Sequence, residues 1–384
     1  MDFSLTSEQS LLQATLRDFA ATRLAPSYAA RDRDEDLPRD FIAELGRMGL
    51  LAPTVPAQYG GQGLDFVSLG IAYEEIARAD LNATYVMLLS GLVGAIIAQN
   101  GDDRQCRAFL PAICRGDVLT ALAVTEPSVG SDAAHLQLSA RRDGDGYALS
   151  GEKSSISFAS GADTALVMAR TGPLEQGAHA ISAFYVDLHS PGISRGRFRD
   201  LGARAVGRGQ LFFDAVRLPA EARVGPEGAG FAQVMRGFDF SRALIGLMCI
   251  GAAEQSLDET AAYVTERKAF GGSLARFEGV SFPLAEASIK LRAARLLCYE
   301  GLWLKDRSLP HGAVAAGCKW WGPELAVQVV HQCLLLHGHP GYSCDLPHQQ
   351  RLRDLIGLEI GDGTAQIMKL IVARDLLGKL ARPY

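Results

Sequence analysis

The sequence lacks the short glycine motifs and the clusters of metal ligands that identify many cofactor-binding proteins. Neither GxGxxG nor GxxxxGK[ST] occurs in the 384 residues, which argues against a Rossmann dinucleotide-binding domain and against a P-loop nucleotide-binding site. The seven cysteines include no CxxC pair, and the eight histidines do not form a set of ligands. We therefore expect no metal site and no framework of disulfide bonds.

The sequence also lacks an excess of positive charge and a hydrophobic run long enough to cross a membrane. Its formal net charge is -5 and its pI is about 5.9, which disfavours nucleic acid or an anionic membrane as the main partner. The most apolar window, residues 86–98, is short and contains Ser90, Gly91 and Gly94. Residues 1–3 lead straight into a helix start, without a secretory signal. These absences predict a cytoplasmic protein.

Hydrophobic periodicity divides the chain into helical, β and helical parts. A capping box of Thr6 and Gln9 opens the first helix, and helical spacing continues to about residue 115. Short apolar runs separated by turn residues then predict an antiparallel barrel or sandwich. Helical periodicity returns near residue 229. We predict an α+β protein with domains at 1–118, 119–228 and 229–384.

The periodicity also predicts the individual elements. After a first helix that reaches about Leu24, helices are expected at 38–48, 66–79, 82–99, 102–114, 229–266, 279–307, 311–337, 347–357 and 364–380. Strands are expected at 120–124, 136–142, 147–150, 165–170, 180–187, 193–198 and 210–217.

A short stretch near the end of the chain contains a candidate catalytic acid. Asp362 lies between Gly361 and Gly363, and Thr364 is placed to cap the helix that follows. Glycines allow a tight turn and the close approach of another molecule. Taken alone, this stretch reads as an ordinary turn or cap, and only motifs elsewhere in the chain favour a catalytic role.

The other motifs also have ordinary explanations when taken singly. The stretch TEPSVGSD at 125–132 suits a polar ring or a phosphate, but it also suits a plain Pro/Gly/Ser loop. Arg267, in the sequence RKAFG, is able to bind a phosphate or to end a helix in solvent. Arg351 and Arg353 beside Asp354 are interpreted as an ion-pair group that holds a turn.

Taken in order, these motifs resemble the acyl-CoA dehydrogenase family over essentially the whole chain. The resemblance is carried by YGGQG at 59–63, TEPSVGSD at 125–132, GEK at 151–153, RKAFG at 267–271, Gly341-Tyr342, Arg353-Asp354 and GDGT at 361–364. It implies an N-terminal helical domain, a middle β-domain and a C-terminal four-helix bundle, usually assembled as a homotetramer, with a dimer as the alternative. It also implies FAD as cofactor, an acyl-CoA substrate that loses hydrogens from Cα and Cβ, and an electron-transfer flavoprotein as electron acceptor.

The resemblance implies roles for individual residues. Positions that match flavin contacts are Val124, Thr125, Ser131, Ser155, Ser157 and Thr364, and Ser131 also matches a position that touches the acyl-CoA. Residues that match contacts to the FAD of a neighbouring subunit are Arg267 and Phe270. Residues that match the substrate side are Asp239, Ser241, Arg242 and Gly363. Asp362 falls where most of the family carries the catalytic glutamate.

An acid at position 362 suits the chemistry that the resemblance implies. Hydrogen-bond donors, by resemblance a flavin ribityl hydroxyl and the backbone N–H of residue 362, polarise the thioester carbonyl and make the α-proton removable. A carboxylate then faces the α-carbon while flavin N5 faces the β-carbon and accepts hydride. Desolvation raises the pKa of such a carboxylate and makes it a better base.

The sequence departs from the family pattern at several positions. Asp362 is one methylene shorter than glutamate, and Ser241 stands where some members carry the base instead. Ser155 replaces a large aromatic residue that commonly lies against the flavin. Glu278 and Leu335 replace frequent glutamines near the neighbour's FAD.

A shorter base and a roomier site favour a bulky acyl group, either α-branched or cyclic. The stretches 276–280 and 358–369 resemble a subgroup that acts on cyclohexanecarboxyl-CoA-like thioesters. Some relatives of that subgroup perform a 1,4-dehydrogenation and need a further acid near the ring, but residues 82–100 contain none, which favours simple α,β-dehydrogenation. A nitroalkane-oxidase-like flavin oxidase and a flavin-containing relative that binds nucleic acid stay open as alternatives, although the latter requires a basic face.

Overall fold

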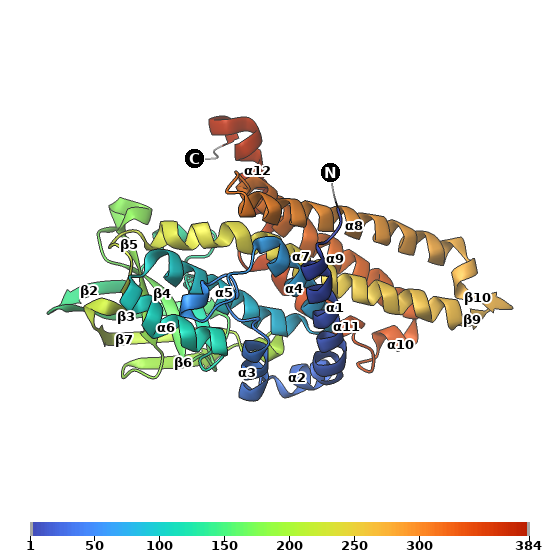
Figure 1. The fold of residues 1–384 in the computed structure, drawn as a ribbon, viewed down its shortest axis with the longest axis horizontal. Coiled ribbons are helices and arrows are strands. Elements are labelled where there is room, and N and C mark those ends of the chain that lie inside the picture. Colours follow the sequence, from blue (N-terminus) through green and yellow to red (C-terminus); the bar gives the residue numbers. More distant parts are fainter. Residues whose placement is uncertain (1–2, 382–384) are drawn as a thin grey trace.

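The computed structural model describes residues 3–381 and consists of three parts that follow one another along the chain (Figure 1). A large β-sheet lies at one end of the molecule, the N-terminal helices pack in its centre, and long C-terminal helices extend to the other end. This arrangement confirms the predicted order of helical, β and helical parts. Residues 1–2, which the sequence places directly before the first helix, and residues 382–384 lie outside the described residues.

The N-terminal part is helical in the described residues. Its helices are α1 (Ser7–Phe19), α2 (Tyr28–Asp34), α3 (Arg39–Arg47), α4 (Phe66–Ala79), α5 (Leu81–Asn100) and α6 (Asp103–Arg115). The capping box of Thr6 and Gln9 is confirmed, because each side chain bonds the backbone N–H of the other residue. The sequence does not predict α2, because this helix buries Arg31 and Asp32 instead of a periodic set of apolar residues.

Helix α5 is the core helix of this part. The expectation that no apolar run is long enough to cross a membrane is wrong for this helix, because the apolar run extends beyond residues 86–98 to 20 residues. However, 89% of its most apolar window is buried inside the protein, as expected for a core helix. Asp80 caps its N-terminus by accepting hydrogen bonds from the backbone N–H groups of Asn82 and Ala83, and it pairs with the buried Arg31. Helix α5 contacts both the sheet and the C-terminal helices, so it lies where the three parts meet.

The middle part is one eight-stranded sheet. Its strands are β1 (Thr120–Ala123), β2 (Ser139–Asp143), β3 (Gly146–Ile156), β4 (Thr164–Arg170), β5 (Ile181–Asp187), β6 (Ile193–Arg197), β7 (Gly209–Leu218) and β8 (Arg223–Val224), in the order β6-β7-β3-β2-β4-β5-β8 with β1 beside β4. Most neighbours are antiparallel as predicted, but β1 and β2 each pair with β4 in parallel. The purely antiparallel prediction is wrong for these two pairs, because the chain crosses over through the β2–β3 hairpin before it forms β4.

Long helices make up the C-terminal part. They are α7 (Gly230–Glu266), α8 (Glu278–Asp306), α9 (Gly312–His337), α11 (His348–Ile360) and α12 (Ala365–Leu377), with the short α10 (His339–Tyr342) before α11. A small hairpin of β9 (Lys268–Ala269) and β10 (Gly272–Ser273) joins α7 to α8, at the end of the molecule farthest from the large sheet (Figure 1). The predicted helices are confirmed, except that the last one ends in a 3₁₀ turn, Gly378–Ala381.

Helices α7 and α9 approach each other closely at Gly246 and Gly322. A Cβ atom on Gly322 would lie 2.8 Å from the Cα of Gly246, and a Cβ atom on Gly246 would lie 2.6 Å from the Sγ of Cys298. Side chains do not tolerate such distances, so the contact requires glycine at both positions. It also brings together the residues one turn earlier on each helix, Arg242 on α7 and Lys319 on α9.

We expect Gly322→Ala to lower the free energy of unfolding by about 1–3 kcal/mol, because the added methyl group forces α7 and α9 apart. Gly317→Ala is a matched control in the same helix, since its Cβ would meet only the Cδ2 of Leu297 at 3.8 Å. That control should be neutral or stabilise the protein by up to about 1 kcal/mol through the higher helix propensity of alanine. Equal effects of the two substitutions in urea unfolding would contradict the close contact.

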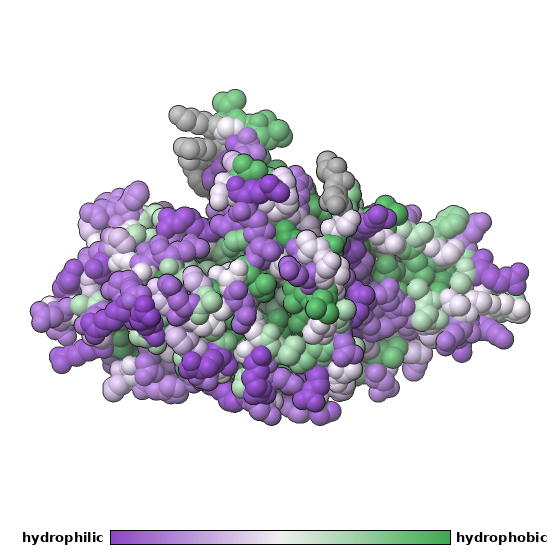
Figure 2. Space-filling view, in the orientation of Figure 1, coloured by the Kyte–Doolittle hydropathy of each residue, from purple (hydrophilic) through white to green (hydrophobic). Residues whose placement is uncertain are grey.

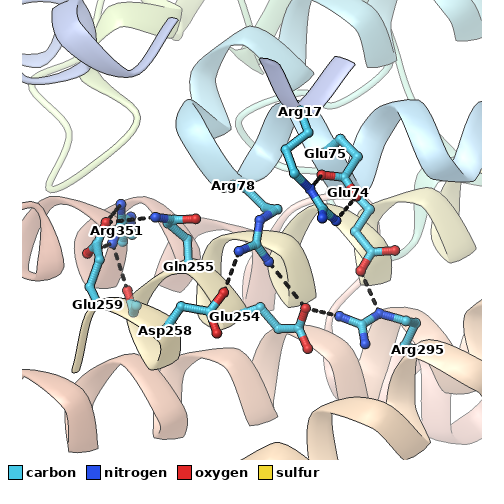
Figure 3. Close-up of polar contacts among 11 residues, drawn as sticks. Arg17, Glu74, Glu75, Arg78, Glu254, Gln255, Asp258, Glu259, Arg295 and Arg351 are labelled. Carbon is cyan, nitrogen blue, oxygen red and sulfur yellow. Dashed lines mark hydrogen bonds and ion pairs between the residues drawn. The ribbon is translucent and has the colours of Figure 1, made fainter. Parts of the chain in front are cut away.

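A network of ion pairs ties the N-terminal helices to the C-terminal helices (Figure 3). The pairs are Arg17–Glu75, Arg78–Glu254, Arg78–Asp258, Arg295–Glu74 and Arg295–Glu254. Glu74 and Glu75 are almost fully buried on α4, so their charges depend on these partners. Helices α1, α4, α7 and α8 are therefore held together by charge as well as by apolar packing.

Asp354 on α11 joins all three parts of the chain. It is fully buried, and its carboxylate accepts hydrogen bonds from the Tyr28 hydroxyl at 2.7 Å, the Asn82 side-chain amide at 3.2 Å and the Ala203 backbone N–H at 2.6 Å. Burial raises the pKa of Asp354 to about 7, although the Ala203 N–H and the Tyr28 hydroxyl favour the charged form. A single side chain thus connects α2, α5, the middle part and α11.

Arg351 and Arg353 form ion pairs, as predicted, but not with Asp354. Arg351 binds Glu259 of α7 at 2.6 and 2.9 Å, and Arg353 binds Asp32 of α2 at 2.7 Å. The prediction of ion pairs is confirmed, but the pairs hold α11 to α7 and α2 instead of holding a turn. Residues that are close in sequence on a helix point in different directions, so each side chain reaches a different element.

Candidate active site

The turn between α11 and α12 has a backbone conformation that its sequence allows. Asp362 has a φ of 55° and Gly363 a φ of 99°. Glycine adopts such angles freely, and aspartate tolerates them better than most other residues do. Thr364 then caps α12 by accepting a hydrogen bond from the backbone N–H of Ile367 at 3.4 Å, which confirms the predicted cap. The strained angle at Asp362 indicates that surrounding groups hold the turn in place.

The Asp362 carboxylate is half-buried and forms no hydrogen bond with any residue from 3 to 381. Burial raises the pKa of Asp362, and the positive charges of Lys319 and Arg242 partly oppose that rise. A carboxylate without bound donors is free to accept a proton, and a raised pKa brings it closer to neutral pH. These are the properties of a general base.

Lys319 of α9 lies directly beneath this turn. Only 1% of the residue is exposed, and its Nζ donates hydrogen bonds to the carbonyl oxygens of Leu358 at 2.7 Å and Gly363 at 2.9 Å. Burial lowers the pKa of Lys319, and the nearby Asp362 carboxylate raises it. The lysine therefore bonds to the backbone on both sides of the candidate base.

Four predicted flavin contacts lie at two neighbouring strand ends. Val124 and Thr125 follow β1, and Ser155 and Ser157 lie at the end of β3 and just after it. The backbone N–H of Ser154 donates to the carbonyl of Thr125 at 2.9 Å, which joins the two segments. Within the described chain, the hydroxyl groups of Thr125, Ser155 and Ser157 form no hydrogen bond with the protein. This edge of the sheet therefore offers free hydroxyl groups to a ligand.

A second buried lysine, Lys153, holds these strand ends together. Its Nζ donates to the carbonyl of Val124 and to Oε1 of Glu126, both at 2.8 Å, and burial lowers its pKa to about 8. Glu126 also accepts hydrogen bonds from the backbone N–H groups of Gln137 and Leu138. The pair thus anchors both ends of the loop that contains the predicted contact Ser131, whose own side chain is exposed.

Among the predicted substrate residues on α7, Arg242 lies close to Asp362. Arg242 is buried and pairs with Asp239 at 3.1 Å, and its charge acts on Asp362. The Nε of Arg242 is a buried donor without a partner in the described chain, which a ligand beside Asp362 is able to satisfy. Ser241 is buried and donates to the carbonyl of Phe238 in its own helix.

A hollow of about 500 Å³ opens beside the same stretch of α7. It is lined by Phe66, Gln99, Lys305, Asp306, Ser308, Leu309 and His311. The ring of Phe66 packs against Phe240 of α7 with 5.1 Å between centroids, and the ammonium of Lys305 lies 5.5 Å from the centre of the Phe66 ring. The hollow therefore combines an aromatic face with a cation, beside Phe240 of α7.

Arg267 and Phe270 lie far from the other candidates. They belong to the β9–β10 hairpin, and the part of α7 from Arg242 to Glu266 is roughly 36 Å long at 1.5 Å per residue. Phe270 is 98% exposed. Thr364, by contrast, lines a hollow of about 360 Å³ between α9 and α12. One chain does not bring the hairpin to this hollow, so both can touch one ligand only if a second chain supplies the hairpin.

Lys319 and Lys153 have site roles that sequence reasoning does not assign, although the motif GEK at 151–153 contains Lys153. Each is a charged residue inside a buried element, which is itself a sign of a buried polar partner. That sign does not identify the partner, because backbone carbonyl oxygens accept both hydrogen bonds of Lys319 and one of the two of Lys153, whose other partner is Glu126. Backbone partners leave no trace in a sequence pattern.

Comparison with known families covers nearly the whole chain. The N-terminal domain of acyl-CoA dehydrogenase matches residues 6–117, the middle domain matches residues 121–216, and the C-terminal domain matches residues 228–377. These three matches follow the same helical, β and helical order as the structure.

Individual proteins are similar over their full length. The short-chain specific acyl-CoA dehydrogenase of Clostridium acetobutylicum is 33% identical over 385 residues, which cover 100% of both chains. The solved structure of butyryl-CoA dehydrogenase from Megasphaera elsdenii has a TM-score of 0.94 and 31% identity, and the match covers 98% of this chain and 100% of that one. A chain solved in work on the electron transferring flavoprotein of Acidaminococcus fermentans has a TM-score of 0.95 and 32% identity, with 99% and 100% covered.

The resemblance read from the short motifs is thus confirmed by domain matches, by full-length relatives and by the fold. An unbonded carboxylate in a glycine turn, free hydroxyls at two strand ends and a buried arginine on α7 occur within that shared architecture. This protein belongs to the acyl-CoA dehydrogenase family, whose members are FAD-dependent oxidoreductases.

Proposed function

We propose that the protein dehydrogenates an acyl-CoA thioester between Cα and Cβ, with Asp362 as the base that removes the α-proton. The observation that carries this proposal is the state of the Asp362 carboxylate, which has a raised pKa and forms no hydrogen bond with the described protein. An aspartate that served only the turn would bond to a backbone N–H of that turn. The carboxylate of Asp362 is instead left free for a ligand.

The residues at the strand ends and at the turn fit a flavin. Its ring has a polar edge with several hydrogen-bonding atoms, and the free hydroxyls of Thr125 and Ser157 and the N-terminus of α12 at Thr364 are suitable partners. Ser155 leaves space beside them. When bound, FAD supplies the two-electron oxidation, and these side chains hold it in place.

According to this proposal, residues of the protein itself carry out the proton transfer. The backbone N–H of Asp362 forms no hydrogen bond within the described residues and is available to the thioester carbonyl. A donor at that oxygen stabilises the charge that develops when the α-proton leaves. The carboxylate of the same residue accepts the proton, and the desolvation that raises its pKa increases its strength as a base.

The hollow beside α7 suits the nucleotide end of coenzyme A. An adenine ring stacks on aromatic faces, and a phosphate group binds cations, which matches the Phe66 ring and the Lys305 ammonium. Phe240, which packs against Phe66 of the hollow, lies two residues before Arg242 on α7, and the charge of Arg242 acts on Asp362. We therefore assign the CoA moiety to this side of the helix.

We further propose that the acyl group is bulky, and cyclohexanecarboxyl-CoA-like thioesters are the favoured class. The base is shorter than glutamate and Ser155 is small, which together leave room beside the reacting carbons. Helix α5, the predicted wall of the acyl pocket, carries no acidic residue between Asn82 and Asn100. That absence of a second acid supports α,β-dehydrogenation over a 1,4 reaction.

Anaerobic reduction of the bound flavin by a panel of linear, branched and cyclic acyl-CoA thioesters tests this proposal. We expect bleaching by acyl-CoA in general and the fastest bleaching by a branched or cyclic member. Bleaching by linear thioesters alone would overturn the bulky-substrate part, and bleaching by nitroalkanes with oxygen uptake would overturn the reaction itself. A preparation that cannot be loaded with FAD would contradict the whole proposal.

Ser155→Trp should lower activity on a branched or cyclic thioester more than activity on a short linear one. The indole fills the space beside the strand end that Ser155 leaves open, and a bulky acyl group needs that space most. The effect is measured as kcat/KM of the variant relative to the parent, for one cyclic and one linear substrate. If kcat/KM falls by the same factor for both substrates, Ser155 does not determine substrate shape.

We propose that the protein acts as a homo-oligomer, a tetramer or a dimer. Large apolar side chains recur every seventh residue on the exposed face of α8, at Phe282, Ile289, Leu296 and Trp303. Figure 2 shows hydrophobic surface over the C-terminal helices and at the tip of α12. An exposed apolar stripe of this length on a helix is typical of a face that packs against another subunit.

Arg267→Ala should weaken FAD binding and the oligomer together. Arg267 is exposed and has no ion-pair partner in the described chain, so its guanidinium is available to the phosphates of a neighbour's FAD. Arg217→Ala is the matched control, since Arg217 is also exposed but pairs with Asp143 on the middle part. FAD retention and sedimentation are measured for both. Parental FAD affinity in Arg267→Ala would refute the inter-subunit assignment.

We also propose an electron-transfer flavoprotein as electron acceptor and a reducing compartment as the location. The similarity to a chain solved in work on an electron transferring flavoprotein supports the first assignment. All seven cysteines are free in the structure, and six of them are buried, which supports the second.

A further inference from the structure

We propose that Lys319 is a positioning residue for the reaction, because it holds the Asp362 turn by two backbone carbonyls and keeps a positive charge beside the carboxylate. The inference rests on the proposed role of Asp362 as the base. Lys319 itself is buried on α9, and its two hydrogen bonds go to the backbone of residues 358 and 363. Its action on the reaction therefore passes through residues 358–363.

The two hydrogen bonds of Lys319 span the turn. Leu358 lies in the last turn of α11, where a carbonyl oxygen has no partner within the helix, and Gly363 directly follows Asp362. Lys319 thus satisfies an acceptor before the candidate base and another after it. Because Asp362 has a φ of 55°, its conformation persists only if the flanking backbone is held.

The packing of α7 against α9 places the lysine at this point. Gly322, one turn after Lys319, lies against Gly246, one turn after Arg242. The contact excludes solvent around the lysine, which raises the cost of its charge and strengthens its bonds to the two carbonyls. A buried lysine at this position is stable only because the turn accepts its hydrogen bonds.

The groups that face Asp362 come from several helices. Tyr85 of α5, Arg242 of α7 and Lys319 of α9 interact with Asp362 directly. Asp239 of α7 acts on Arg242, and Cys249 of α7 and Glu359 of α11 act on Lys319. Arg242 and Lys319 are the cations among them, and Arg242 already pairs with Asp239 at 3.1 Å. Lys319 has no carboxylate within ion-pair distance in the described chain, and Asp362 is the first charge that acts on it. Its positive charge is therefore directed mainly at Asp362.

Two neutral variants separate the charge of Lys319 from its hydrogen bonds. Lys319→Met removes both, whereas Lys319→Gln removes the charge but keeps an N–H donor that is able to reach one carbonyl. Without the ammonium, the apparent pKa of the Asp362 carboxylate rises, so the acidic limb of the kcat/KM profile for flavin reduction should move up by about one pH unit in both variants. Above that limb, kcat should fall more in Lys319→Met than in Lys319→Gln, with KM little changed.

Lys290→Met is the matched control, because it removes a lysine that pairs with Glu286 on the surface of α8. It should leave the pH profile in place. An unchanged acidic limb in both Lys319 variants would overturn the proposal, even if their stability fell, because a purely structural lysine does not move the pKa of a base.

A reciprocal measurement does not depend on the folding of the Lys319 variants. The charge on Asp362 raises the pKa of Lys319, so Asp362→Asn should lower that pKa, as followed by NMR of ¹³Cε-labelled lysine. Equal titration of Lys319 in the parent and in Asp362→Asn would overturn the coupling. If Asp362→Asn instead kept the parental rate of flavin reduction, the proposed base would be wrong while the Lys319 titration still reported on the contact.

Discussion

Asp362→Asn should keep FAD and acyl-CoA binding but reduce its flavin about 10²–10⁴-fold more slowly than the parent. The amide is nearly the same size as the carboxylate and leaves the backbone N–H of the turn in place, so binding survives. It cannot accept a proton, so the α-proton stays on the substrate. Stopped-flow bleaching under anaerobic conditions measures the slower flavin reduction, and a separate measurement of acyl-CoA binding checks that binding is retained.

Parental bleaching by Asp362→Asn would show that Asp362 is only a turn residue and that the base lies elsewhere. Asp362→Glu is a sharper test of geometry. It moves the carboxylate one methylene further out, and it also places a longer side chain at a φ of 55°, which glutamate adopts less readily than aspartate. We expect a preference that shifts from bulky to linear thioesters. A substrate preference identical to that of the parent would remove the link between base length and acyl shape.

Asp354→Leu should lower the free energy of unfolding by about 3–5 kcal/mol, because it leaves buried donors without an acceptor. Those donors are the Tyr28 hydroxyl, the Asn82 amide and the Ala203 N–H, each of which belongs to a different element. Asp345→Leu is the control, since Asp345 is exposed on the same part of the chain, and it should change stability by less than about 0.5 kcal/mol. Urea unfolding of both variants measures the difference, and similar values for the two would contradict the role of Asp354.

The raised pKa of Asp354 adds a dependence on pH. Its carboxyl group binds a proton more tightly in the folded protein, with a pKa of about 7, than at its ordinary value of 3.8. This group therefore contributes stability that is complete below about pH 4 and is lost as the pH rises through about 7. The corresponding slope should be present in the parent and absent from Asp354→Leu. An equal slope in both would assign the titration to another group.

Much of the fold was predictable from local patterns. The capping box of Thr6 and Gln9, the cap at Thr364 and the boundaries of α7 and α9 follow from residues that act on their own neighbours. Helix α2 was not predictable in this way. Its buried residues include Arg31 and Asp32, which are polar by sequence and are buried only because Asp80 and Arg353 pair with them.

The candidate site was predictable in part, through the resemblance and not through geometry. The motifs identified Asp362 and the hydroxyl residues near the strand ends, because family members share them. They did not identify Lys319, whose partners are backbone carbonyls, the role of Lys153 within its motif, or the true partners of Arg351 and Arg353. Those contacts join elements that are distant in sequence, and no local pattern encodes which elements meet.

The bond between Tyr28 and Asp354 joins residues that are 326 positions apart. At roughly 5–20 residues per second, a ribosome needs about 15–65 s to make the chain between them. Until α11 is made, the Tyr28 hydroxyl and the Asn82 amide have no acceptor from it, and for the first part of that interval α7 is also absent from the face of α5 that it contacts. The core of the N-terminal helices therefore remains incomplete while the rest of the chain is translated. Completion of this protein is a late event in its synthesis, and a nascent chain halted before α11 remains a client for chaperones.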